Sequence, residues 1–179
     1  MSDFTPAGVD AATADKTCAL LQHRLNALID LELTLKHVHW NVVGPNFIGV
    51  HEMLDPQVDH VREMVDDVAE RMAALGGVPR GTPGAVVNGR SWNDYEIGRD
   101  NAIAHLGALD VVFSGVIKDH RSVVEELEGV EPITQDMMIE QTGILEQDQW
   151  FVRAHLESSN GQLTTEGIDT ERRAAQAAG

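Results

Sequence analysis

The sequence is poor in cysteine and in basic residues. The first shortage excludes a disulfide within the chain, and the second disfavours nucleic acid as a partner. Cys18 is the only cysteine, so the chain cannot form an internal disulfide, and a reducing compartment suits it. Lys and Arg together number 13 against 29 Asp and Glu, which gives a formal net charge of −16. That balance disfavours binding to the phosphates of nucleic acids and favours the attraction of cations.

Long apolar runs are also missing. No segment approaches the roughly 20 apolar residues of a membrane-spanning helix, so we expect no membrane association. No stretch near the N-terminus has a basic start followed by an apolar run. We therefore expect no secretory signal and a cytoplasmic protein.

Apolar residues at helical spacing predict four long helices in one domain. The predicted helices cover about residues 14–43, with Thr13 as N-cap, and about residues 48–75, 98–128 and 134–157. Turn residues between 76 and 91 predict a crossing loop, so the helix order is that of an all-α four-helix bundle with a long crossover connection. Residues 1–12 predict a mobile N-terminal tail, 13–160 the domain, and 161–179 a largely mobile tail with a short helical turn near residues 170–178.

The predicted helix 48–75 carries the residues that suggest a metal site. Its apolar stripe consists of Leu54, Val58, Val61, Val65, Val68, Met72 and Leu75. At 100° per residue, His51, Asp55, Asp66 and Glu70 fall together in a neighbouring sector roughly 100° wide. These four side chains therefore do not face the core of their own bundle. The first pair lies about 20 Å along the helix from the second, so the pairs cannot bind one ion within a single chain.

A second, antiparallel copy of the same helix brings the two pairs together. The numbers 51 and 70 have the same sum as 55 and 66. In an antiparallel pair of these helices, residue 51 of one chain therefore faces residue 70 of the other, and residue 55 faces residue 66. A two-fold axis near Asp59 and His60 would set the first pair of one chain opposite the second pair of the other. Such an isologous dimer has two identical metal sites at its interface.

Three segments resemble a known family. They are His39-Trp40-Asn41-Val42, then His51-Glu52-Met53-Leu54-Asp55, then Asp66 with Ala69-Glu70-Arg71. Together they resemble the ferroxidase signature of the Dps mini-ferritins, the "DNA-binding protein from starved cells" family, over about residues 13–160. Residue types and spacings agree at every ligand position. The resemblance implies a ferritin-like fold, a short helix within residues 91–97, and a site shared between two-fold-related chains. One chain would supply His39, His51 and Asp55, and its neighbour Asp66 and Glu70.

Two imidazoles and three carboxylates form a mixed nitrogen and oxygen site that suits Fe²⁺ and lacks the thiolates typical of structural zinc. The resemblance implies oxidation of Fe²⁺, preferably by hydrogen peroxide or else by oxygen, with up to two ions at each site. Trp40 would shield the site or intercept stray oxidant, or else pack as an interface aromatic, and these roles are compatible. Larger ferritins bind two irons inside one bundle through Glu-x-x-His. None of the eight histidines here has Glu three residues before it, which disfavours that site.

The resemblance also implies storage of ferric oxide in a hollow homo-dodecamer, which protects DNA and the cell from oxidative damage. Iron would pass through acidic pores near the start of the predicted helix 134–157. Candidates for the pore lining are Glu131, Asp136 and Glu140. The alternative is that these acids only stabilise the positive end of a helix dipole.

The tails depart from those expected of a DNA-binding protein, which are rich in Lys or Arg. Acidic and basic residues of the two tails are Asp3, Asp10, Asp15 and Lys16, then Glu166, Asp169, Glu171, Arg172 and Arg173. We expect weak or no DNA binding at physiological salt, and nucleoid association stays open. An alternative function is a nucleoid-packing protein whose metal site is structural or vestigial. A hydrolytic use of the interface metal is a third.

Overall fold

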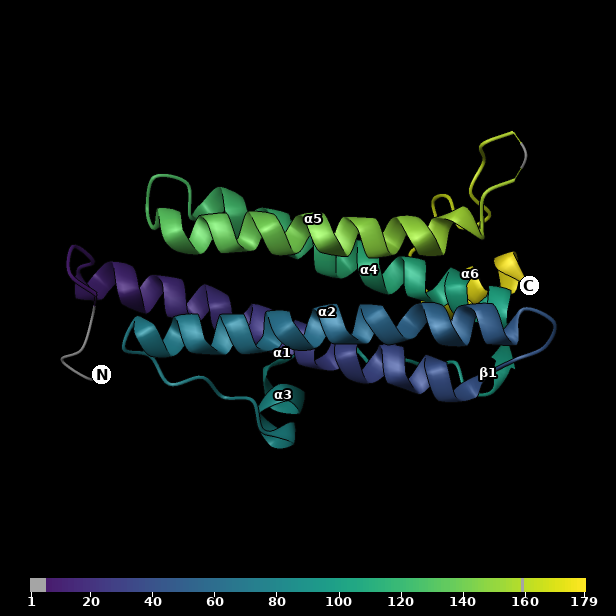
Figure 1. Cartoon of the computed structure of the whole chain (residues 1–179), viewed down its shortest axis with the longest axis horizontal. Coiled ribbons are helices and arrows are strands. Elements are labelled where there is room, and N and C mark those ends of the chain that lie inside the picture. The colour runs from purple at the N-terminus through teal and green to yellow at the C-terminus, as the bar shows by residue number, and fades with distance from the viewer. Residues whose placement is uncertain (1–5, 159) are drawn as a thin grey trace.

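The structure is a computed structural model that describes residues 6–158 and 160–179. Residues 1–5, which belong to the predicted N-terminal tail, lie outside the described residues. Four long helices form the body, and they are α1 (Ala11–Asn41), α2 (Phe47–Ala74), α4 (Ala102–Glu126) and α5 (Pro132–Ala154). Helix α1 packs along α2, and α4 packs along α5 (Figure 1). The predicted all-α four-helix bundle with a long connection between its two pairs is therefore confirmed.

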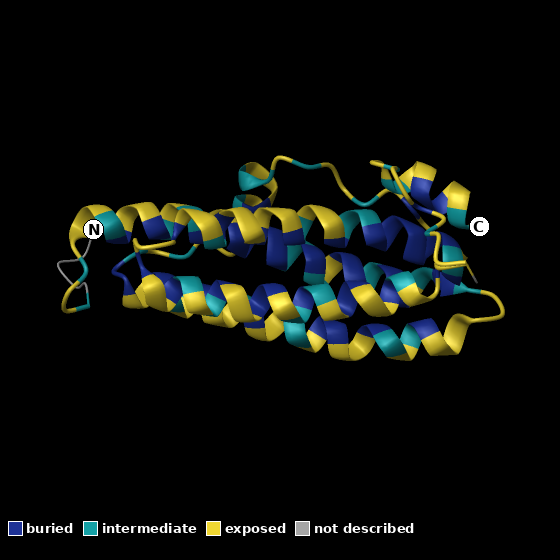
Figure 2. Cartoon of the chain, turned by 90° about the horizontal axis from the view of Figure 1, so that it is seen from above, coloured by how far each residue is buried: buried dark blue, intermediate teal, exposed yellow. Residues whose placement is uncertain are grey.

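The apolar stripes predicted for the four helices meet in one core. Leu54, Val61 and Val68 of α2 are completely buried, and Phe113 of α4 and Leu145 of α5 pack into the same cluster. Figure 2 shows that buried residues lie on the inner faces of the helices and exposed residues on the outer faces. Within residues 6–158 and 160–179, no helix combines the length and the apolar character needed to cross a bilayer.

Side-chain caps determine where the helices begin, and they move the predicted starts by a few residues. Helix α1 begins at Ala11 because the Asp10 carboxylate accepts hydrogen bonds from the backbone N–H of Thr13 (2.9 Å) and from its hydroxyl (3.0 Å). Helix α4 begins at Ala102 because the Asn101 side chain accepts from the N–H of Ala104 at 3.0 Å. Each cap satisfies an N–H group that has no partner inside the helix.

The connection from α2 to α4 differs from the prediction. Its short helix is α3 (Pro83–Gly89), which packs against α1, and no helix forms in residues 91–97. Pro83 favours this start because its fixed φ suits the first helical turn. The connection ends in β2 (Asp100–Asn101), which pairs in parallel with β1 (Val42–Val43) just after α1. This pairing ties the end of α1 to the start of α4.

The C-terminal segment, expected to be a largely mobile tail, packs on the bundle in this structure. The helical turn predicted near its end is α6 (Glu171–Ala178), which lies along α4 (Figure 1). The two helices approach so closely that a Cβ added to Gly107 would lie 2.6 Å from the carbonyl oxygen of Ala174. The Thr165 hydroxyl also donates a hydrogen bond of 2.8 Å to buried Asp110. Small residues make this contact possible, and they leave no apolar periodicity in the sequence.

Candidate metal centre

The turn between α1 and α2 brings together the three ligands predicted for one chain. His39 lies in the last turn of α1, whereas His51 and Asp55 lie in the first turns of α2. The two imidazole rings stack with their centroids 3.6 Å apart and their planes inclined by 27°. The Nε2 atom of His39 lies 3.0 Å from Oδ1 of Asp55. We call these three residues the histidine half-site.

The hydrogen bonds of the two histidines leave nitrogen atoms free for a metal ion. The Nδ1 atom of His51 lies 2.9 Å from the backbone carbonyl oxygen of His39. Because a carbonyl only accepts, Nδ1 carries the proton and Nε2 keeps its lone pair. His39 is only 9% exposed; among the described residues its Nδ1 has no hydrogen-bond partner, and its Nε2 faces the Asp55 carboxylate, itself a predicted ligand. A buried imidazole with an unpartnered nitrogen beside a carboxylate fits the role of a metal ligand.

The charges at the half-site favour the protonation states that a metal ion requires. Burial lowers the pKa of His39, so its ring is neutral at neutral pH. A hydrogen bond from Lys36, whose Nζ lies 3.0 Å from Oδ1, and the nearby His39 lower the pKa of Asp55. The role of Lys36 could not be predicted from the sequence, because its contact with Asp55 depends on how α1 and α2 approach each other.

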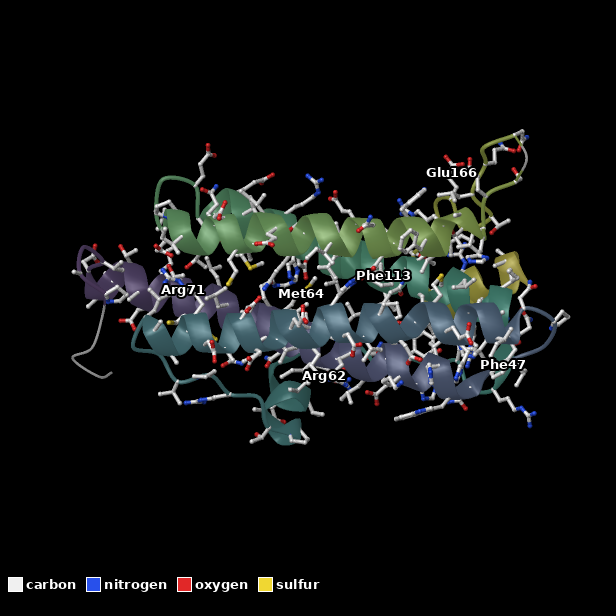
Figure 3. The ribbon with its side chains drawn as sticks, viewed as in Figure 1. Phe47, Arg62, Met64, Arg71, Phe113 and Glu166 are labelled. Atoms are coloured by element: carbon white, nitrogen blue, oxygen red, sulfur yellow. The ribbon has the colours of Figure 1, made fainter. Side chains whose placement is uncertain are left out.

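The other two predicted ligands lie further along α2. Asp66 and Glu70 are both exposed and one helical turn apart, and we call them the acidic half-site. Fifteen residues separate His51 from Asp66, so the half-sites are about 20 Å apart. Arg62, between them in sequence, lies on the side of α2 away from α5, whereas Met64 points toward α5 (Figure 3). Within the described part of one chain, no group of three or more His, Cys, Asp or Glu side chains is arranged to hold a metal ion.

Exposed apolar side chains lie close in sequence to the ligands of the histidine half-site, and one of them contacts His51. Trp40 is 70% exposed, Ile48 57% and Phe47 38%, and the Phe47 ring lies 5.0 Å from that of His51. Trp40 thus remains largely uncovered within its own chain. Neighbouring exposed apolar side chains are typical of a surface that another protein covers.

Glu131 does not belong among the pore candidates. It is 3% exposed, caps α5 by accepting a hydrogen bond of 2.8 Å from the N–H of Thr134, and pairs with Nη2 of Arg71 at 2.7 Å. In Figure 3, Arg71 lies between α2 and α5. The carboxylate therefore joins two helices and cannot line a channel. Asp136 and Glu140 are exposed on α5 and stay pore candidates.

Replacement of Glu131 by Gln is expected to lower the free energy of unfolding at pH 7 by about 1–3 kcal/mol, because charge-assisted hydrogen bonds are lost. Burial by itself raises the pKa of Glu131, but hydrogen bonds from Thr134 and Arg71 outweigh it and hold the pKa below its usual 4.5. The stabilisation is therefore present above pH 4.5 and is lost as the pH falls through the folded-state pKa. Chemical denaturation at pH 7 and pH 3 measures it. Exposed Glu140→Gln is the control, and equal losses in both variants would contradict the assignment.

Comparisons with known proteins assign this fold to a class. A family model described as "Ferritin-like domain" matches residues 18–160, so the chain is a ferritin-like protein. It is 56% identical over 178 residues to the "DNA protection during starvation protein" of Mycolicibacterium smegmatis, covering 99% of this chain and 97% of that protein. Within the ferritin-like class, the chain belongs to the Dps mini-ferritin family.

Solved structures agree with this assignment. "Mycobacterium smegmatis Dps" matches with a TM-score of 0.93 and 56% sequence identity, covering 95% of this chain and 97% of that chain. "DpsA14 from Streptomyces coelicolor" matches with a TM-score of 0.89 and 61% identity, covering 90% and 96% of the two chains. The relatedness thus extends over nearly the whole sequence.

Proposed function

We propose that this protein oxidises Fe²⁺ at sites shared by two chains and stores the ferric product inside a cage, in the cytoplasm. The observation that supports this most directly is the division of the ligands. His39, His51 and Asp55 gather at one end of the outer face of α2, with nitrogen atoms free to bind. The second carboxylate pair lies at the other end of the same helix, out of reach within one chain.

An antiparallel contact between two α2 helices would complete two sites at once. It would set the histidine half-site of each chain opposite the acidic half-site of the other. The exposed Phe47 ring against His51, with Trp40 and Ile48 exposed nearby in sequence, supports a self-contact here. Dps proteins form hollow cages, and we propose that six such dimers assemble into a dodecamer.

The proposed chemistry is a two-electron reduction of hydrogen peroxide by two ferrous ions. Each Fe²⁺ gives up one electron, and peroxide with two protons becomes two molecules of water. Because both electrons enter one peroxide, little hydroxyl radical is released, which would protect DNA and the cell. Carboxylates bind the ferric product more strongly than the ferrous reactant, and the neutral imidazoles supply the remaining ligands.

Addition of Fe²⁺ and hydrogen peroxide to the assembled protein without oxygen tests this proposal. We expect rapid oxidation that consumes about one peroxide for two ferrous ions, followed by a soluble ferric core. Stopped-flow absorbance, peroxide titration and the sedimentation of the core measure the three quantities. Oxidation no faster than in protein-free buffer would overturn the proposal and favour a structural metal site.

Replacement of Asp136 by Asn is expected to slow iron uptake about 2- to 5-fold, because every chain that lines a pore loses one carboxylate that attracts cations. Oxidation at saturating iron should change little, since Asp136 is not a proposed ligand. Core formation at limiting Fe²⁺ measures uptake. Glu126→Gln, an exposed acid at the end of α4, is the control. Equal uptake rates in both variants would remove Asp136 from the pore.

DNA binding is the second candidate function, and the relatives' name speaks of DNA protection. In this chain the two arginines of α6 are already paired, Arg172 with Glu96 at 3.6 Å and Arg173 with Asp169 at 3.3 Å. With a net charge of −16, we expect no stable retarded complex in a gel-shift experiment at about 150 mM salt. A retarded band at that salt concentration would contradict this expectation and support the nucleoid-packing function.

A further inference from the structure

A cavity of about 280 Å³ lies between α1, α4 and residues 91–95, with the first residue of α6 among its lining residues. Its walls are mainly apolar side chains, such as Leu31 of α1 and Val112 of α4, and two aromatic side chains, Trp92 and Tyr95, also line it. No residue of α2 contributes. The cavity is therefore separate from the proposed metal centre.

Three carboxylates reach this cavity, and two of them have cationic partners. Asp30 binds Nη1 of Arg90 at 3.0 Å and Nε1 of Trp92 at 2.7 Å. Asp119 pairs with Nη2 of Arg24 at 3.2 Å. Their charges are thus largely balanced within the chain.

Glu171 differs from the other two carboxylates. It accepts one hydrogen bond, from the N–H of Glu96 at 3.2 Å, and among residues 6–158 and 160–179 no Lys, Arg or His lies within ion-pair distance of it. Burial raises the pKa of Glu171, and the nearby charges of Glu96 and Asp30 act in the same direction. A half-buried carboxylate with no balancing cation loses part of its hydration, and a bound cation would restore a favourable partner.

We propose that this cavity binds a small organic cation, a primary ammonium group carried on an apolar or aromatic body. The ammonium would pair with Glu171, and the body would lie among the apolar side chains of α1 and α4. The rings of Trp92 and Tyr95 would add cation–π attraction. A bare metal ion would gain nothing from the apolar walls, a neutral ligand would leave Glu171 without a cation, and an anion would be repelled by the Glu171 carboxylate. Few convergent polar groups in an apolar cavity are typical of small-molecule sites.

Calorimetric titration of the assembled protein with 2-phenylethylammonium tests the charge requirement. We expect saturable binding that is at least tenfold weaker in Glu171→Gln, with no binding of neutral 2-phenylethanol. Glu166→Gln removes the same charge from an exposed position in the segment after α5 (Figure 3), which is not among the lining residues of the cavity, and should bind like the wild type. No binding by the wild type, or equal binding of the neutral alcohol, would overturn the proposal.

Gly115 offers a second test, because it lines the cavity and an added Cβ there meets no atom within 4 Å. Gly115→Leu should place its side chain in the cavity and abolish binding, while the helix gains a better helix former. Gly143→Leu on α5, where an added Cβ also meets nothing within 4 Å, is the matched control and should bind normally. Undiminished binding in Gly115→Leu would place the ligand elsewhere. Iron oxidation should be unchanged in all four variants.

Discussion

Chains carrying Asp66→Asn and chains carrying His51→Ala are each expected to lose iron oxidation by a factor of about 100, and to regain about a quarter of wild-type activity when co-expressed. Each variant alone lacks one half-site in every chain. In a mixed dimer, both defects fall in the same site, and the other site has intact ligands from both chains. Half of randomly formed dimers are mixed, and each has one of its two sites intact.

The recovery separates a shared site from one that lies within a single chain. If each chain bound iron with its own residues, mixing two inactive chains would restore nothing. Oxidation of Fe²⁺ by peroxide in the purified mixed assembly measures the result. Asp67→Asn, the neighbouring exposed carboxylate on α2, is the control and should retain activity alone. Absence of recovery in correctly assembled mixtures would contradict the two-fold arrangement.

Phe113→Ala is expected to lower the free energy of unfolding by about 3–5 kcal/mol. The Phe113 side chain is completely buried in the core cluster, so its removal loses apolar burial and leaves a cavity that the long helices cannot readily close. Chemical denaturation followed by circular dichroism measures the change. Protein concentration must be constant, because assembly adds to the apparent stability.

Phe151→Ala is the control for this loss, because it removes the same side chain from a position that is 38% exposed. Its effect should be smaller than that of Phe113→Ala by at least about 1.5 kcal/mol, since less buried surface is lost. Similar losses in the two variants would mean that Phe151 is buried in the assembly or that the core relaxes around position 113.

The long helices could be predicted from the sequence because each buries one continuous apolar stripe. The stripe through Leu54, Val61 and Val68 has helical spacing, and no other structure would bury all three on one side. The sequence predicts a helical turn near residues 170–178, but the packing of α6 on the bundle could not be predicted in the same way. Helix α6 packs through alanines against Gly107, and closeness of approach, rather than apolar periodicity, makes that contact.

The candidate site could be predicted only in part, because some of its contacts join segments that are distant in the sequence. The placement of His51 and Asp55 on one helix face follows from their spacing alone. The approach of His39 to Asp55 depends on the turn between α1 and α2, and spacing does not define that turn. The burial of Glu131 depends in turn on Arg71, 60 residues away. Contacts between distant segments decide whether an acid is available to an ion.

The separation of the two half-sites has a consequence for the fate of unassembled chains. On the proposed function, a newly made or dissociated chain would bind iron too weakly to oxidise it. Oxidation would then begin only where two chains have paired, and specific activity should fall as the protein is diluted below the dissociation constant of that pair. The need for pairing would thus keep single chains from precipitating iron in free solution.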